Sequence, residues 1–366
     1  MASIRKRTLP SGQISWLVDF KDRNGRRRAR QFPTKREADA YLVKARAEVA
    51  AGVYVHDTVT VVEAGQAWLK TCVERCERGQ RMERATLRDY ESKLRLHILD
   101  PEVGLCGFKL PRLTRKVVNE FRDDLLASGR SEAQTRKILS VLNLIIAHAQ
   151  AEGLIVHNPA QGVQVIRSSR VERRLRVPKK EEVRCLIETA SDSLRPLIVV
   201  AALCGLRASE TRGLRWCDID FDEGFVHVRQ RADAFNEIGE TKSSAGWRSV
   251  PMGPIVRNTL RQWRLICPKS PLELVFPTKR GSIQAQSNIL KRHFKPLCRR
   301  LDIEMRWHDL RHFAVSLWIE QGFSVKEVVT FAGHSSVQMT MDRYGHLFPS
   351  PDHQRGMAEI EARLLG

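Results

Sequence analysis

Residues 308–312 have the sequence His-Asp-Leu-Arg-His, and this stretch decides how the C-terminal half of the chain is interpreted. Residues three and four positions apart are neighbours on a helix surface, so His308, Arg311 and His312 are expected on one helical face. Two imidazoles and a guanidinium gathered in this way can hold an anion or move a proton.

Two further polar residues follow this stretch. His334 comes directly after Gly333, and the glycine predicts the C-terminal end of a helix. Tyr344 lies further on among polar residues. An isolated histidine or tyrosine usually belongs to a core or a surface, so neither residue identifies a site by itself.

Three more candidates precede the stretch. Arg207 follows Gly205-Leu206 at the end of an apolar segment, and Glu210 lies three residues later. Lys242 lies in the sequence Thr-Lys-Ser-Ser-Ala-Gly, which predicts a β-turn between strands at 225–229 and 248–252. The order Arg, Lys, His-x-x-Arg, His, Tyr is therefore contained in one segment.

This order resembles the tyrosine recombinase family of phage-type integrases, and the resemblance covers residues 175–366 at the level of motifs. It implies a mixed, mainly α catalytic domain with a small antiparallel sheet. Glu210 is expected to orient Arg207, and His312 is expected to support the site. The resemblance implies six catalytic residues, with Tyr344 as the nucleophile: Arg207, Lys242, His308, Arg311, His334 and Tyr344.

The resemblance also implies a reaction. Tyr344 would attack the scissile phosphorus, giving a 3′-phosphotyrosine and a free 5′ hydroxyl. Arg207 and Arg311 would neutralise the non-bridging oxygens, and His334 would add a hydrogen bond. Lys242 would protonate the 5′ oxygen, and His308 would act as the base or proton relay.

This reaction keeps the phosphoester bond, so neither a cofactor, a metal nor ATP is expected. Exchange between two duplexes passes through a Holliday junction and implies a homotetramer on double-stranded attachment-site DNA. A small excisionase is the further partner that the resemblance implies.

The N-terminal part of the chain carries much of the excess positive charge. The 366 residues contain 62 Lys and Arg against 42 Asp and Glu, a formal net charge of +20. Residues 1–36 hold 11 of the basic and 2 of the acidic residues. Alternating apolar residues over 14–20, a turn at 22–25 and a return strand predict a β-hairpin, followed by a helix from Thr34. Four arginines of the return strand are candidate DNA contacts: Arg26, Arg27, Arg28 and Arg30.

The predicted fold is therefore multidomain. A small β-hairpin/α unit (1–56), expected to bind arm-type DNA sites, precedes an all-α core-binding bundle (57–166), a basic linker (167–178) and the catalytic domain (179–366). Helices are predicted in the bundle at 60–76, 86–99, 114–128 and 131–151. The amphipathic tail over 353–364 is expected to dock on a neighbouring protomer or, alternatively, to pack on its own domain.

The same residues are also compatible with other functions. His308, His312 and His334 could bind zinc in a metallohydrolase, although Asp309 stands where a zincin has glutamate. A regulator that binds recombination sites without cutting them is a second alternative. Within the family, a chromosome-dimer resolvase usually lacks an N-terminal arm-binding unit, and a type IB topoisomerase relaxes DNA without sequence-paired sites. The basic β-hairpin unit favours the integrase of a phage or other mobile element.

Eight scattered cysteines, no apolar run of spanning length and no secretory signal predict a cytoplasmic protein that acts on the chromosome, with no membrane partner.

Overall fold

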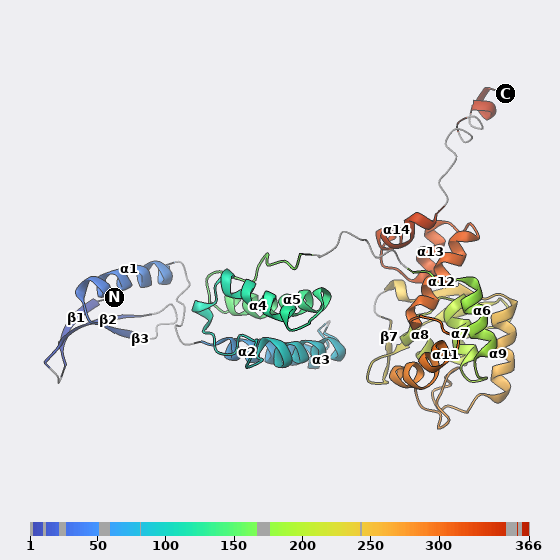
Figure 1. The fold of residues 1–366 in the computed structure, drawn as a ribbon, viewed down its shortest axis with the longest axis horizontal. Coiled ribbons are helices and arrows are strands. Elements are labelled where there is room, and N and C mark those ends of the chain that lie inside the picture. The colour runs from blue at the N-terminus through green and yellow to red at the C-terminus, as the bar shows by residue number, and fades with distance from the viewer. Residues whose placement is uncertain are drawn as a thin grey trace. The chain divides into compact units, whose positions relative to one another are not determined.

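The computed structural model describes residues 3–9, 12–21, 27–50, 59–80, 82–166, 176–241, 244–348, 357 and 361–365 (Figure 1). The chain divides into two compact units, Met1–Val171 and Glu172–Gly366. The division falls inside the predicted basic linker. Each unit is described by itself.

The first unit begins with an antiparallel sheet in the order β1-β2-β3, covered by helix α1. Its small core includes Val18, Phe20, Ala38 and Leu42. The predicted hairpin is confirmed, whereas β1 was not predicted, because its charged sequence shows no apolar alternation. The turn at 22–25 and Arg26 lie outside the described residues. The elements are β1 (Ser3–Thr8), β2 (Ile14–Lys21), β3 (Arg27–Phe32) and α1 (Lys35–Ala50).

The rest of this unit is helical, as predicted, and has its own apolar core. Thr60, Thr114 and Ser131 are N-caps whose hydroxyls accept a backbone N–H, so three helix starts are confirmed. The second helix ends differently from the prediction, because its last turn is a π-helix (η1, Leu94–Ile98). The helices are α2 (Val61–Glu77), α3 (Arg84–Lys93), α4 (Arg115–Ala127) and α5 (Glu132–Ala151), with a 3-10 turn, η2 (Leu110–Arg112).

The second unit combines helices with two small antiparallel sheets, one in the order β4-β5-β8 and one hairpin, β6-β7. Its strands are β4 (Ile219–Asp220), β5 (Phe225–Val228), β6 (Gln230–Ala232), β7 (Ile238–Glu240) and β8 (Arg248–Pro251). Its α-helices are α6 (Lys180–Thr189), α7 (Arg195–Leu203), α8 (Ala208–Gly213), α9 (Pro254–Ile266), α10 (Gln286–Asn288), α11 (Lys295–Arg300), α12 (Trp307–Glu320), α13 (Val325–Ala332) and α14 (Val337–Tyr344). Shorter helical turns are η3 (Trp216–Asp218), η4 (Ser244–Gly246), η5 (Ile289–Phe294) and η6 (Gly345–Leu347).

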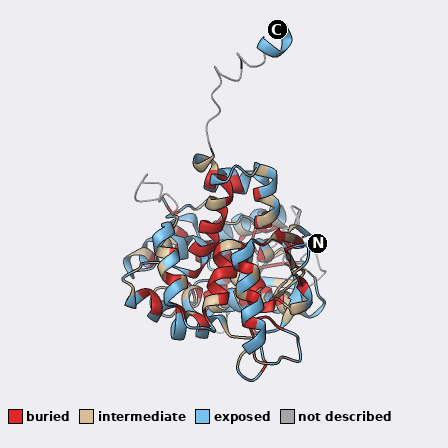
Figure 2. Ribbon diagram, turned by 90° about the vertical axis from the view of Figure 1, so that its right-hand side faces the viewer, coloured by how far each residue is buried: buried red, intermediate tan, exposed pale blue. Residues whose placement is uncertain are grey.

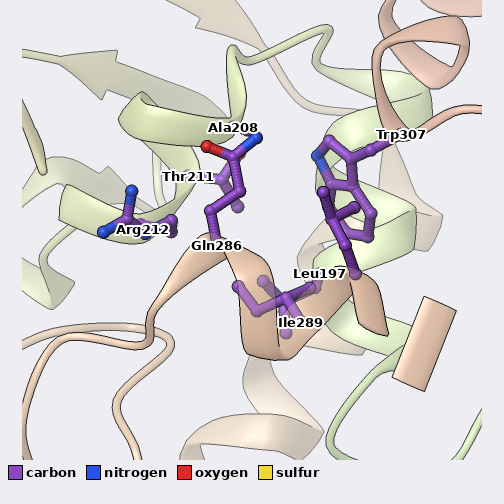
Figure 3. Close-up of a pocket in the computed structure, with 8 residues that line it drawn as sticks. Leu197, Ala208, Thr211, Arg212, Gln286, Ile289 and Trp307 are labelled. Carbon is purple, nitrogen blue, oxygen red and sulfur yellow. The ribbon is translucent and has the colours of Figure 1, made fainter. Parts of the chain in front are cut away.

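Helices α7 and α12 pack against each other at the centre of this unit. Helix α7 is apolar on nearly all sides, which is the pattern of a fully buried helix, and Figure 2 shows the buried positions gathered on the inner helices. A small pocket beside α8 is bounded by α7, α10 and the start of α12 (Figure 3). Apolar side chains such as Leu197, Ile289 and Trp307 line this pocket together with residues of α8, the helix that begins directly after Arg207.

The C-terminal tail is described only in part. Met357 and residues 361–365 are helical and exposed, and the remainder of the predicted docking helix lies outside the described residues. Across the described ranges, no helix is both long and apolar enough to span a membrane.

Candidate active site

Two of the predicted catalytic arginines meet at the C-terminal end of α13. Arg207 donates from Nη2 to the carbonyl oxygen of Gly333 at 2.5 Å. Arg311, on α12, donates from Nη1 to the carbonyl of Gly205 at 2.6 Å and from Nη2 to the carbonyl of Ala332. The last carbonyls of a helix lack partners inside the helix and carry partial negative charge, so they attract these cations. The packing thus joins residues more than a hundred positions apart.

Glu210 fixes the orientation of Arg207. Its carboxylate accepts from Arg207 Nη1 at 2.7 Å and from the Arg207 backbone N–H at 2.8 Å. Burial by itself would raise the pKa of Glu210, but the charges of Arg248 and Arg207 outweigh burial and lower that pKa to about 2. The carboxylate is therefore ionised at neutral pH.

Arg248, which no sequence motif had indicated, completes this cluster. Its guanidinium, 1% exposed, donates to both oxygens of Glu210, at 3.1 and 2.9 Å. Its position in the strand was the signal that could have indicated it. Arg248 begins strand β8 and, being two residues from Val250, shares the buried face of the strand with it. An arginine on the apolar face of a strand needs a buried anion.

Gly333 ends α13 in the left-handed conformation, with φ of +62°, as the sequence predicted for a helix end. The turn presents His334, whose Nδ1 lies 2.8 Å from the hydroxyl of Thr340. Burial, reinforced by the charge of Arg311, lowers the pKa of His334 to about 3. The imidazole is therefore neutral at physiological pH.

Tyr344 is the last residue of α14, and its ring stacks on that of His334 with centroids 6.3 Å apart. The side chain is buried, and burial raises the pKa of its phenol to about 12 despite the charge of Arg311. Its hydroxyl lies 2.5 Å from Nδ1 of His312. At neutral pH the phenol holds its proton and needs a partner that can accept it.

The imidazole beside this phenol is not the one expected. The resemblance implied His308 near Tyr344 as base or relay and His312 in a supporting role, whereas in the structure Nδ1 of His312 lies next to the phenol. His308 lies one ring further away, edge-on to His312 with centroids 4.7 Å apart. Burial lowers the pKa of His312 to about 4, so its imidazole is neutral and can accept a proton.

The remaining candidates have different environments. Lys242 lies outside the described residues. In the N-terminal sheet Arg27 donates to Asp19 at 3.0 and 2.9 Å, and the guanidinium carbon of Arg30 lies over the ring of Tyr41, 5.1 Å from its centroid. Among the described residues no three His, Cys, Asp or Glu side chains are placed to hold one metal ion. These residues therefore offer no zinc site of the kind that the metallohydrolase alternative requires.

Comparison with known proteins identifies the relatives of this chain. The profile of the Phage integrase family matches residues 176–350. Tyrosine recombinase XerC of Xanthomonas axonopodis is 30% identical over 227 residues, covering 60% of this chain and 69% of that protein. The ICEBs1 integrase of Bacillus subtilis is 27% identical over 272 residues, covering 70% and 72%.

The fold has solved counterparts as well. A lambda integrase tetramer bound to a Holliday junction has 19% identity and a TM-score of 0.63, covering 95% of this chain and 96% of that one. The fold described here is thus shared with solved integrases. This chain belongs to the tyrosine recombinase family and is a site-specific recombinase.

Proposed function

We propose that this protein is the integrase of a phage or other mobile element, and that it cleaves and rejoins DNA through a 3′-phosphotyrosyl bond at Tyr344. The observation that carries the proposal is the convergence of Arg207, Arg311, His334 and Tyr344 around the end of α13. A phosphodiester seated there would meet two guanidinium forks and the phenol that attacks it.

The proposed step balances without an outside reagent. The phenolic oxygen forms a bond to phosphorus while the bond from phosphorus to the 5′ oxygen breaks. The phenol proton passes to the neutral imidazole of His312, with His308 as the next ring of a relay. Lys242 protonates the leaving 5′ oxygen. Attack by a 5′ hydroxyl on the phosphotyrosine reverses the step and rejoins the strand.

In this proposal Arg207 and Arg311 neutralise the negative charge that develops on the non-bridging oxygens as the phosphorus is attacked. We therefore expect strand exchange to persist in EDTA. Chelator-sensitive exchange that zinc restores would favour the metallohydrolase instead.

Four protomers on a Holliday junction form the proposed assembly, and the solved lambda integrase tetramer on such a junction supports it through its shared fold. The basic N-terminal sheet favours an integrase of a mobile element over a chromosome-dimer resolvase, and the likeness to the ICEBs1 integrase supports the same choice. An excisionase partner and exchange of the C-terminal tail between protomers stay predictions.

Covalent capture tests the proposal. The protein is incubated with a library of nicked duplexes with randomised cores, on which cleavage releases a short strand and traps the enzyme. We expect a protein–DNA adduct that resists denaturation, with the 3′ phosphate attached to Tyr344 in peptide mass spectra. A protein that binds DNA tightly but never becomes attached would instead be the site-binding regulator.

A further inference from the structure

We infer that Arg248 is a positioning residue for the phosphate clamp, holding Arg207 and the turn before His334 in register with the η4 turn (Ser244–Gly246), which follows Lys242 in sequence. This inference rests on the proposed function. It assigns Arg248 a role without contact to the DNA, because its guanidinium is buried behind the residues that would touch the phosphate.

The first observation is the set of groups that Arg248 joins. Its Nε donates to the carbonyl of Phe331 at 2.7 Å, and its Nη1 donates to the carbonyl of Gly246 at 3.1 Å. The same guanidinium holds Glu210 through both carboxylate oxygens. One side chain therefore ties together the start of α8, the end of α13 and the turn that begins just after Lys242 in sequence.

The second observation is how three arginines share the end of α13. Its last carbonyls, at 331, 332 and 333, accept in turn from Arg248, Arg311 and Arg207. Two of these cations are the proposed phosphate clamp, and the third is Arg248. A shift of Arg248 would therefore move the carbonyls on which both clamp residues rest, together with His334, which follows directly.

The third observation is close packing at Gly333. A Cβ at this glycine would lie 2.9 Å from Nη1 of Arg248 and 2.9 Å from the carbonyl oxygen of Ala245. The guanidinium therefore lies directly against the turn that presents His334. Packing that leaves no space for a Cβ at position 333 also leaves little room for the turn to move while Arg248 stays in place.

Stability alone does not explain such a residue. A buried ion pair can often be replaced by well-packed apolar residues without loss of stability, because desolvation offsets the attraction. Arginine does supply geometry, since its planar fork donates in fixed directions to several acceptors at once, which a lysine ammonium does not match. Arg248 uses this property in four hydrogen bonds, two to the carboxylate of Glu210 and two to backbone carbonyls.

A matched control exists in the same unit. Arg212, on α8, is also buried, and within the described part of the chain its hydrogen bonds run to Gln284, Ala232, Asp233 and Asn236. It is equally embedded but holds neither Glu210 nor the end of α13. Replacing it tests what loss of a buried arginine does in general.

The test is a double-mutant cycle with full-length protein on nicked duplexes selected by covalent capture with the wild type. Arg248→Gln is expected to slow single-turnover adduct formation by about 10- to 100-fold, because small misplacements of a catalytic group are costly. In an Arg207→Ala background the same change is expected to cost only about three- to tenfold, because one of the groups that Arg248 holds is already absent while Arg311 and His334 remain. Arg212→Gln should slow both backgrounds by the same factor.

A second readout uses a duplex with a neutral methylphosphonate at the scissile position. Removing the charge reduces the demand on the clamp, so Arg248→Gln should lose much less on this duplex than on phosphate. A defect of general stability would slow both duplexes alike. Arg248→Lys keeps the charge against Glu210, and we expect it to recover only part of the rate.

The outcomes separate the two proposals. No adduct with any duplex for the wild type overturns the proposed function. An adduct with the wild type, but equal losses for Arg248→Gln in both backgrounds, overturns only the role of Arg248. Where Arg248→Gln does not fold, Arg248→Lys takes its place in the cycle. Unfolding of both, with Arg212→Gln still folded, also overturns the inference, because Arg248 then merely holds the domain together.

Discussion

The end of α13 and the N-terminal sheet both use arginine, but in opposite ways. At the end of α13, the guanidinium groups of Arg311 and Arg248 are buried and bound to carbonyls or to Glu210. In the N-terminal sheet the side chain of Arg27 is 68% exposed, although it pairs with Asp19. Burial fixes the direction of each donor at the catalytic centre, whereas an exposed arginine can follow the uneven path of a DNA backbone.

The difference predicts which reaction step each region controls. Loss of a fixed donor should lower the rate of cleavage more than it lowers binding. Loss of an exposed charge should lower affinity and its salt dependence while leaving the chemical step unchanged.

The sharpest test removes the proposed nucleophile. Tyr344→Phe should abolish covalent capture, because the phenylalanine ring has no oxygen to form the bond to phosphorus. DNA affinity, measured by fluorescence anisotropy, should change little. Tyr90→Phe is the matched control and should form adduct normally. An adduct in the Tyr344→Phe protein would mean that another residue attacks.

Removing a clamp residue should have the next largest effect. Arg207→Ala is expected to slow single-turnover cleavage by about 10²- to 10³-fold, the usual cost of losing one transition-state donor. Its dissociation constant for the same duplex should change far less. Similar losses in rate and affinity would show that Arg207 serves only to hold DNA, and would remove the contrast between the two regions.

Deleting residues 1–56 tests the N-terminal region by removing it. We expect cleavage at the core site to continue, which also shows that the rest of the chain is folded, while binding to a second class of sites disappears. DNase footprints on DNA that flanks a captured core site measure both effects. Unchanged footprints would contradict the assignment of the N-terminal unit to arm-type sites.

The two regions should also differ in how acid changes their stability. Burial lowers the pKa of His312 to about 4, against about 6.5 in an unfolded chain. Below about pH 6.5 the unfolded chain binds protons that the folded site excludes, so the free energy of unfolding falls until about pH 4. The hydrogen bond from Arg27 lowers the pKa of Asp19, whose stabilising effect is retained above about pH 3.9 and lost only below it.

Hydrogen exchange, corrected for its intrinsic pH dependence, can follow both regions between pH 7 and 4.5. Protection should weaken in α12 and α14 while β2 and β3 keep theirs. His312→Asn removes one titrating imidazole and should flatten the change in α12 by up to about 1.4 kcal/mol per pH unit. Equal weakening of both regions would show that the buried histidines do not set the acid sensitivity.

The smallest expected effect concerns a single exposed charge. Arg27→Gln should weaken DNA binding similarly on all sequences and reduce the slope of log affinity against log salt by about 1. Asp19→Asn keeps the cation and removes its partner, so it should leave the slope unreduced. A loss confined to one DNA sequence would instead indicate that Arg27 contacts bases.

Much of the local structure could be predicted from sequence, because it depends on neighbouring residues. Thr60, Thr114 and Ser131 begin helices since their hydroxyls accept the next free N–H groups, and Gly333 ends one because it adopts a positive φ at little cost. The π-helical turn at 94–98 and strand β1 were missed, since neither follows from apolar periodicity.

By itself, the sequence determined the family, the order of the candidate catalytic residues and the helix that carries His308, Arg311 and His312, because motifs and helical periodicity are properties of short segments. Only the tertiary structure decided that His312 contacts the phenol of Tyr344 and that Arg248 holds Glu210. These pairs form where elements from distant parts of the chain pack together, and burial determines which partners their polar groups can reach.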